Sequence, residues 1–215
     1  MEEKSLQKIG GVSAIFEALI YISAFIVYGG LLPYPAPNAS ANEKLQFLTD
    51  NQLILSILNF TSYILFGILL VSLVQALHQR LKSYAPMLSK IASVFGFIWM
   101  GLVIASGMIA NIGLNQVIET GNTDPEKAML IYSIVGIVTE GLGGGNEIVG
   151  GIWVLLLSFM AWRSNNFNKA TNLLGFIVGI AGILTIYPLE IFKEVFGLGQ
   201  IIWFLAIGIT MIRKP

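Results

Sequence analysis

Six long apolar segments, separated by charged and proline-containing turns, are the feature that most limits what this chain can fold into. They cover residues 9–32, 53–77, 91–114, 144–162, 170–189 and 195–212. An α-helix needs roughly 20 apolar residues to cross a hydrocarbon core about 30 Å thick. The chain is 55% hydrophobic and 11% charged, far from the composition of a water-soluble domain. The sequence therefore predicts an all-α, six-span transmembrane helix bundle, with residues 1–215 forming a single integral membrane domain.

The basic residues divide unequally between the two ends of such a bundle. Lys44, Lys127 and Lys193 fall at one end. The other nine fall at the opposite end: Lys4, Lys8, Arg80, Lys82, Lys90, Arg163, Lys169, Arg213 and Lys214. Because cytoplasmic loops carry the excess of Lys and Arg, this asymmetry predicts a multi-pass protein of a prokaryotic inner (plasma) membrane with both termini in the cytoplasm.

The stretch from Pro125 to Arg163 is too long for one simple span. Asp124-Pro125-Glu126 is typical of a helix start, with Asp124 or Thr123 as the N-cap. One straight helix from there to Arg163 would measure roughly 58 Å, about twice the hydrocarbon thickness. The sequence predicts an additional short helix over residues 126–140 that is interfacial, re-entrant or an extension of a span. A glycine-rich break would then lead into the fourth span.

That break, "GLGGGNE", places rare charges beside flexible backbone. Gly141, Gly143, Gly144 and Gly145 are candidate hinge residues, and Gly175 with Gly179 has the spacing of a close helix contact. Irregular backbone at membrane depth is tolerated only where it is buried in protein or lines a wet cavity. Helix packing and a cavity-lining hinge are both compatible with the Gly141–Gly145 cluster.

Polar residues inside the predicted spans are candidate ligand-binding residues. Glu17 lies within the first span, where a carboxyl group is costly and marks a functional site or a neutral, packed acid. Glu140 and Glu147 cluster with Asn146 near the outer face. The helix dipole favours an acid in the first turn of a helix, so capping explains Glu147 equally well. Glu140 lies at the end of the short helix, where an acid is less favourable, and it is therefore the stronger functional candidate of the two.

Two asparagines, Asn59 and Asn111, lie deep in the second and third spans, where amides serve as interhelical hydrogen-bonding groups or line a site. The tryptophans and several tyrosines either pack or wall a pocket. The ones considered are Trp99, Trp153, Trp162, Trp203, Tyr21, Tyr28, Tyr63 and Tyr187.

Several classes of chemistry find no support. The chain has no cysteine, and His78 is its single histidine, so thiolate chemistry and Cys/His zinc sites are excluded. We predict no metal, no cofactor and no catalytic residue. A formal net charge of zero gives no reason to expect nucleic acid, so the predicted partner is the lipid bilayer. Because the embedded segments carry carboxyl groups but no Lys or Arg, a proton, a cation or a neutral amphipathic molecule fits better than an anion.

Three stretches carry a family resemblance: "KIGGVSAIFEALIYI", "NEIVGGIWVLLLS" with the turn that follows it, and "GLGQIIWFLAIGITMIR". In this order, and over nearly the whole chain, the sequence resembles the bacterial and archaeal membrane family catalogued as domain of unknown function 4386. The resemblance implies a six-helix membrane protein without an assigned activity, and it supplies no site residues.

Three functions follow as hypotheses. The first is an integral membrane protein that binds or transports a small neutral, cationic or lipid-like ligand in a bundle cavity. The second is an intramembrane enzyme that uses Glu17 or Glu140 as acid or base, which needs a second polar group within hydrogen-bond reach. The third is a non-catalytic scaffold or partner subunit. The sequence favours the first and leaves the oligomeric state open.

Overall fold

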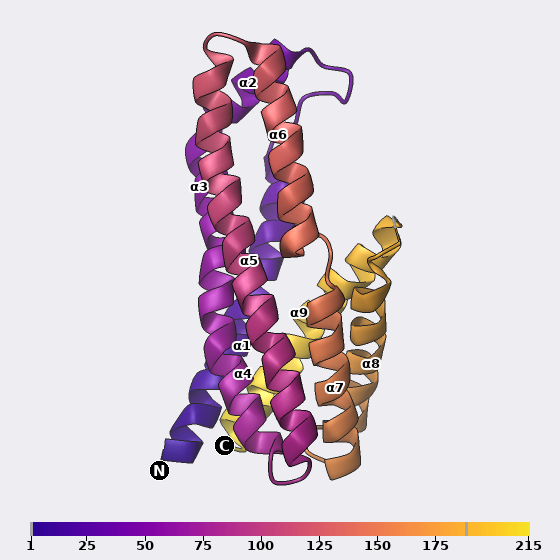
Figure 1. Ribbon diagram of the computed structural model, residues 1–215. Helices are drawn as coiled ribbons and strands as arrows, with labels where there is room; N and C mark the ends of the chain where they lie inside the picture. The colour runs from indigo at the N-terminus through magenta and orange to yellow at the C-terminus, as the bar shows by residue number, and fades with distance from the viewer. Residues whose placement is uncertain (1, 188) are drawn as a thin grey trace.

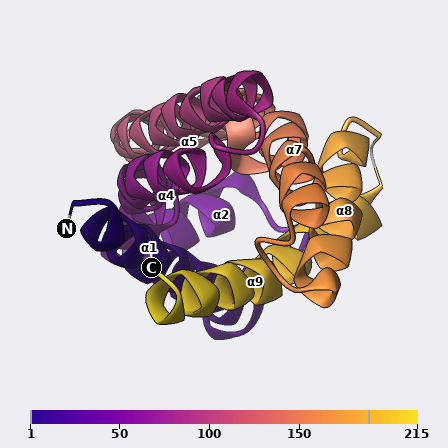
Figure 2. The same ribbon diagram turned by 90° about the horizontal axis from the view of Figure 1, so that it is seen from below.

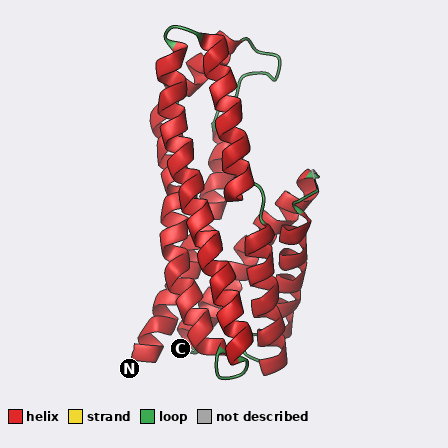
Figure 3. Cartoon of the chain, in the orientation of Figure 1, coloured by secondary structure: helices red, strands yellow, loops and turns green. Residues whose placement is uncertain are grey.

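The computed structural model describes residues 2–187 and 189–215, and within them the chain is helical and contains no strand (Figure 3). The all-α prediction is confirmed. The helices are α1 (Glu2–Ile26), α2 (Ala41–Asp50), α3 (Gln52–Asn59), α4 (Phe66–Leu81), α5 (Pro86–Gly121), α6 (Pro125–Thr139), α7 (Ile148–Ser164), α8 (Lys169–Leu184) and α9 (Glu190–Arg213). Three short π-helical segments interrupt or extend them: η1 (Val27–Leu31), η2 (Phe60–Leu65) and η3 (Glu140–Gly144).

Six of the helices form a closed ring. Going round it, α1 packs on α4, α4 on α5, α5 on α7, α7 on α8, α8 on α9, and α9 returns to α1 (Figure 2). Both chain ends lie at the same end of this ring (Figure 1). We call that end the base, and the opposite end the top.

Five helical stretches are long and apolar enough to cross a membrane: residues 2–31, 52–81, 86–121, 125–164 and 190–213. This agrees with a multi-pass membrane protein. The predicted fifth span is shorter than expected, because α8 has 16 residues and ends at Leu184 rather than Leu189. By length and composition alone, α8 falls just below the roughly 20 residues of a typical span.

The α5–α6 hairpin rises beyond the tops of α7, α8 and α9 (Figure 1). Its first helix, α5, has 36 residues and measures about 54 Å at helical rise. A small second core lies among the upper half of α5, α6, α2 and α3, and it includes Leu48, Leu114 and Ala128. The upper part of the molecule therefore has a hydrophobic core of its own, which holds the surrounding segments in place.

The predicted start of the short helix is confirmed. Asp124 is the N-cap of α6, its carboxylate accepts a hydrogen bond from the Lys127 N–H at 3.0 Å, and Pro125 occupies the first turn. A second cap begins α2, where Ser40 and Glu43 bond reciprocally as a capping box. Hydrogen bonds from the Ser40 N–H and hydroxyl hold the pKa of Glu43 below its usual value.

Glycines let the helices of the ring approach closely. On α7, a Cβ added to Gly151 would lie 2.7 Å from the carbonyl oxygen of Gly179 on α8. A Cβ on Gly175 would collide with Ser158, and Gly11 and Gly208 make the matching contact between α1 and α9. Such small-residue contacts are how helices associate tightly in a lipid environment.

Candidate ligand-binding cavity

A cavity of about 410 Å³ opens among α1, α4, α5 and the start of α7, toward the top of the ring. Its walls are mainly aromatic and aliphatic, and its one carboxyl group is that of Glu147. The lining residues include Tyr21, Phe25, Tyr28, Tyr63, Phe66 and Trp99. We call it the main cavity. Its volume falls in the range of sites that hold small organic molecules.

All three π-helical segments supply residues to this cavity. Tyr28 and Gly29 come from η1, Tyr63 comes from η2, and Gly143 with Gly144 comes from η3. A π turn widens the helix and shifts the side chains that follow it, and such turns are frequent at functional sites. Segments far apart in the sequence therefore depart from regular helix at the same place in the fold.

Glu147 is held inside the cavity by a specific contact. Its Oε2 accepts a hydrogen bond from the indole N–H of Trp99 at 3.1 Å. Its backbone N–H donates to Thr185 Oγ1 at 2.8 Å, which ties the start of α7 to the end of α8. Although Glu147 occupies the N-cap position of α7, its side chain makes no capping hydrogen bond. The carboxyl group is thus turned toward the cavity, and capping does not explain it.

The break before α7 depends on Gly143. This residue has φ of +142°, a conformation that L side chains rarely adopt, and it separates α6 from α7. The predicted glycine break is confirmed. It lets the chain turn beside α5, where the Ser106 hydroxyl donates to the Thr139 carbonyl oxygen at 3.2 Å.

A second cavity of about 350 Å³, the upper cavity, adjoins the main cavity and shares Tyr28, Tyr63 and Gly144 with it. Here Asn59 accepts a hydrogen bond from the Tyr28 hydroxyl at 3.3 Å and donates to Asn111 Oδ1 at 3.1 Å. Asn111 in turn donates to the Ser56 carbonyl oxygen at 3.3 Å, and the two amides join the second and third long helical stretches.

The remaining polar groups of the upper cavity come from its outer wall. Tyr34 belongs to the loop before α2, and partial burial raises the pKa of its hydroxyl above the usual value. Glu140, at the start of η3, also lines this cavity, but its side chain is 67% exposed.

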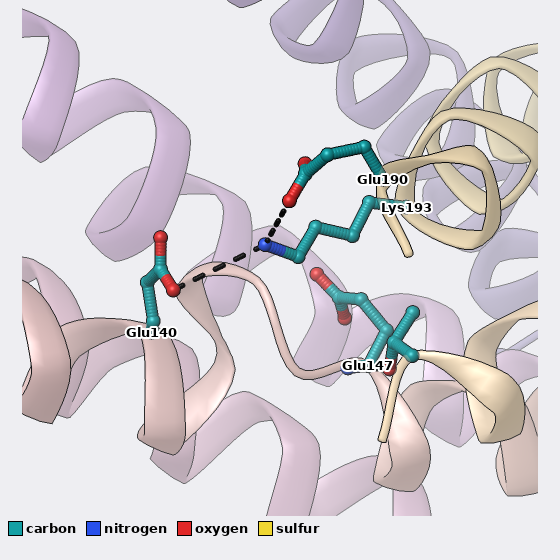
Figure 4. Close-up of polar contacts among 5 residues, drawn as sticks. Glu140, Glu147, Glu190 and Lys193 are labelled. Carbon is teal, nitrogen blue, oxygen red and sulfur yellow. Dashed lines mark hydrogen bonds and ion pairs between the residues drawn. The ribbon is translucent and has the colours of Figure 1, made fainter. Parts of the chain in front are cut away.

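An ion-pair cluster lies beside the η3 turn. Lys193 Nζ, from the first turn of α9, lies 3.2 Å from Glu190 Oε1 and 4.0 Å from Glu140 Oε2 (Figure 4). Because Glu140 and Glu190 are largely exposed, these pairs contribute little to stability. They do connect the broken turn to α9 across the top of the ring.

An aromatic cluster continues from the wall of the main cavity into the helix bundle. The Trp99 ring lies 5.7 Å from Trp153, which lies 5.9 Å from Trp203, measured between ring centroids. Phe66 and Phe204 extend the cluster toward Tyr21. The tryptophans of this cluster are almost completely buried, and Trp99 belongs both to the cluster and to the cavity wall.

Glu17 lies elsewhere. It is 0% exposed, it lines neither cavity, and both of its carboxyl oxygens lack a hydrogen-bond partner within the described residues. The structure therefore separates the predicted candidates into three groups: Glu147 in the main cavity, Asn59, Asn111 and Glu140 around the upper cavity, and Glu17 within the helix bundle.

The other predicted residues have local roles. Asn146 accepts a hydrogen bond from the Ile148 N–H at 3.4 Å and stays within its own turn. Gly141 and Gly145 accompany the break, whereas Gly175 and Gly179 pack α8 against its neighbours. Sequence reasoning passed over Phe25, Phe66 and Ser62 as lining residues, because nothing in their local pattern distinguishes them from other positions in the spans.

Across residues 2–187 and 189–215, no group of three or more His, Cys, Asp or Glu side chains gathers in a way that could hold a metal ion. The lining residues of the two cavities include Glu147 and Glu140 but no Lys, Arg or His. The fold and the cavity thus define a multi-pass helical membrane protein with an acidic, aromatic-walled chamber.

The chain belongs to the family described as Domain of unknown function (DUF4386), which matches residues 9–212. This match confirms the resemblance found in the sequence. Neither a curated protein nor a solved structure matches the chain.

Proposed function

We propose that the protein crosses a prokaryotic inner membrane six times, with both termini in the cytoplasm, and binds a small amphipathic ligand in the main cavity. The ligand is an organic amine or a neutral molecule of similar size, with an apolar body and a hydrogen-bond-donating head group. The observation that carries this proposal is the convergence of three π-helical segments on one aromatic cavity that contains a single carboxyl group.

The chemistry of the walls supports this ligand class. Aromatic faces attract an ammonium group through their quadrupoles, and Glu147 offers a negative or hydrogen-bond-accepting partner. An anion would meet the Glu147 carboxyl group with no basic lining residue to balance it. The two acids considered for catalysis lie apart from this centre, Glu140 at the exposed mouth and Glu17 in the bundle, which favours binding over intramembrane catalysis.

A count of six crossings requires that α8, the predicted fifth span, crosses the membrane. Its Leu173, Ile177 and Ile180 form an exposed apolar stripe at helical spacing, as a lipid-facing helix requires. The helix lies between α7 and α9 in the closed ring, and it measures about 24 Å, a length that a thin or locally thinned bilayer accommodates.

Ligand binding is tested with three compounds of one shape: 4-phenylbutylamine, 4-phenylbutanol and 4-phenylbutanoate. The amine should raise the unfolding temperature of the purified protein in detergent most, and the anion least, because ligands stabilise the folded state that binds them. Glu147→Gln keeps the shape of the side chain but cannot ionise, so it should weaken amine binding about 10- to 100-fold.

Glu119→Gln is the matched control, because Glu119 is exposed near the end of α5, away from the cavities. It should bind the amine as the wild type does. Equal amine affinity in wild type and Glu147→Gln, or tightest binding of the anion, would show that the proposed site is wrong.

Topology is tested by cysteine labelling, for which the natural chain offers a clean background because it has no cysteine. In intact cells, a membrane-impermeant maleimide should label Asn122→Cys and Tyr187→Cys at the top. Ser83→Cys at the base should react only after permeabilisation. Protection of Tyr187→Cys in intact cells would remove α8 from the spans, and labelling of Ser83→Cys would reverse the orientation.

A further inference from the structure

The buried face of α1 carries polar side chains along much of its length. Gln7, Ser13 and Glu17 are each at most 5% exposed, and Tyr21, one turn beyond Glu17, lines the main cavity. They recur every four to six residues, at spacings that keep them on one side of the helix. A span that faced only its neighbours' apolar side chains would not need this stripe, and such polar series in membranes mark ion and proton pathways.

Glu17 is the acidic member of the stripe, and its position has no structural explanation. Neither carboxyl oxygen has a hydrogen-bond partner among the described residues, although the group is completely buried. Gln200, on the inward face of α9, is also 0% exposed with both side-chain polar atoms unpartnered. Burying a polar group without a partner is expensive, and this cost favours a role other than packing for a buried acid of this kind.

At the base of the ring, the polar stripe of α1 is hydrogen-bonded to α4 and, through Arg80, to the C-terminal end of the chain. Gln7 donates to the Ala76 carbonyl oxygen at 2.7 Å, and Arg80 donates to Gln7 Oε1 at 3.1 Å. Arg80 also donates to the Lys214 carbonyl oxygen at 2.9 Å, at the C-terminal end of the chain. Along α1, Glu17 thus lies between this polar cluster at the base and the aromatic cavity above it.

Tyr21 connects Glu17 with the cavity. The two residues are one helical turn apart on α1, about 6 Å along the axis. Tyr21 in turn lines the main cavity together with Glu147 and Tyr63. A charge that arrives in the main cavity therefore changes the energy of a charge on Glu17.

Within the described part of the chain, the charged groups of the helices packed on α1 lie near the two ends of the bundle. The elements packed on α1 are α4, α9, η1 and η2. In α4, His78 bonds to Ser89 and Arg80 to Gln7, both near the base. In α9, Lys193 pairs with acids at the top, and Glu190, Glu194 and Arg213 lie in the end turns. The two π segments contribute only Tyr28 and Tyr63 as ionisable groups.

We propose that Glu17 is a proton-binding site coupled to the main cavity, so that binding of an organic ammonium ion there releases the proton from Glu17 toward the base. The inference rests on the proposed function, which supplies the cavity ligand. Charge balances in the exchange: one cation enters, the Glu17 carboxyl group becomes a carboxylate, and one proton leaves. By reciprocity, a proton on Glu17 weakens ammonium binding by the same factor. This is the exchange that a proton-coupled amine antiporter requires.

The experiment measures the carbonyl stretch of buried protonated carboxyl groups by infrared difference spectroscopy on the full-length protein in lipid, during a pH titration. Wild type should show a band that Glu17→Gln lacks. Adding 4-phenylbutylamine should lower the pH at which this band disappears by about one unit, as expected for a cation roughly 10 Å from a carboxyl group in a protein interior. Glu119→Gln should behave as wild type.

If Glu17→Gln does not fold, Glu147→Gln gives the same assignment, because Glu17 is then the buried carboxyl group that remains. An amine that binds without moving the Glu17 band overturns the coupling and leaves the cavity proposal standing. A Glu17 band that never titrates also overturns it. If the amine does not bind to wild type, the proposed function fails first, and the coupling fails with it.

Discussion

Gly151→Val should destabilise the protein by about 3 kcal/mol or more, at or above the upper end of the usual cost of overpacking. A Cβ at this position would lie 2.7 Å from both the Gly179 carbonyl oxygen and the Ile183 backbone nitrogen. Because these neighbours are backbone atoms, rotation of a side chain cannot relieve the contact, and α7 must separate from α8. The unfolding temperature in detergent measures the loss.

Gly101→Val is the control for this experiment. Gly101 lies within α5, and an added Cβ would meet nothing within 4 Å. Its replacement changes helix propensity by only a few tenths of a kcal/mol, so the unfolding temperature should stay close to that of wild type. Equal unfolding temperatures for Gly151→Val and wild type would refute the close α7–α8 packing.

Gly143→Ala should cost about 1–3 kcal/mol and should reduce amine binding at the same time. The added methyl group has room, since its nearest neighbour would be a Val103 carbon at 3.4 Å. The cost arises from φ of +142°, which alanine rarely adopts. A shift of this residue toward helical angles would move Gly144 and Glu147, which line the main cavity.

Gly141→Ala, two residues earlier, separates this effect from a general intolerance of the segment. Gly141 does not have positive φ, and an added Cβ would meet nothing within 4 Å. It should keep both the stability and the amine-induced stabilisation of wild type, measured in the same thermal assay. A Gly143→Ala protein that keeps both would show that the break tolerates other backbone angles.

Much of the helical architecture could be predicted from the sequence, because several helix boundaries coincide with a strong local signal. Asp124 and Pro125 predict the start of α6, and the glycine cluster predicts where it ends. The short α8 could not be predicted as such. Its apolar run continues to Leu189, and the helix ends earlier because the Thr185 hydroxyl bonds back to Gly182 and receives the Glu147 N–H.

Less of the main cavity than of the fold could be predicted from the sequence. The π-helical segments have no sequence signature, since a π turn results from how neighbouring helices pack. Tyr21, Tyr63 and Trp99 come from three different helical stretches, and no spacing rule predicts that they meet.

The acids show the same limit. Of the two acids near the outer face, the sequence favours Glu140 as the functional one because it lies at a helix end. In the structure, Glu147 is the one that is bonded to Trp99 inside the main cavity, whereas Glu140 is largely exposed. The hydrogen bond between the Trp99 indole and Glu147 distinguishes the two acids. It joins residues far apart in the chain, so a single sequence cannot predict it.

The chain of tryptophans that continues from the wall of the main cavity has a practical consequence. Three of the four indoles in the protein, Trp99, Trp153 and Trp203, stand within 6 Å of one another in series, so excitation absorbed by one passes readily to the next. The first of them shares its N–H with Glu147. Native ultraviolet emission therefore reports, without any dye, on whatever enters the chamber.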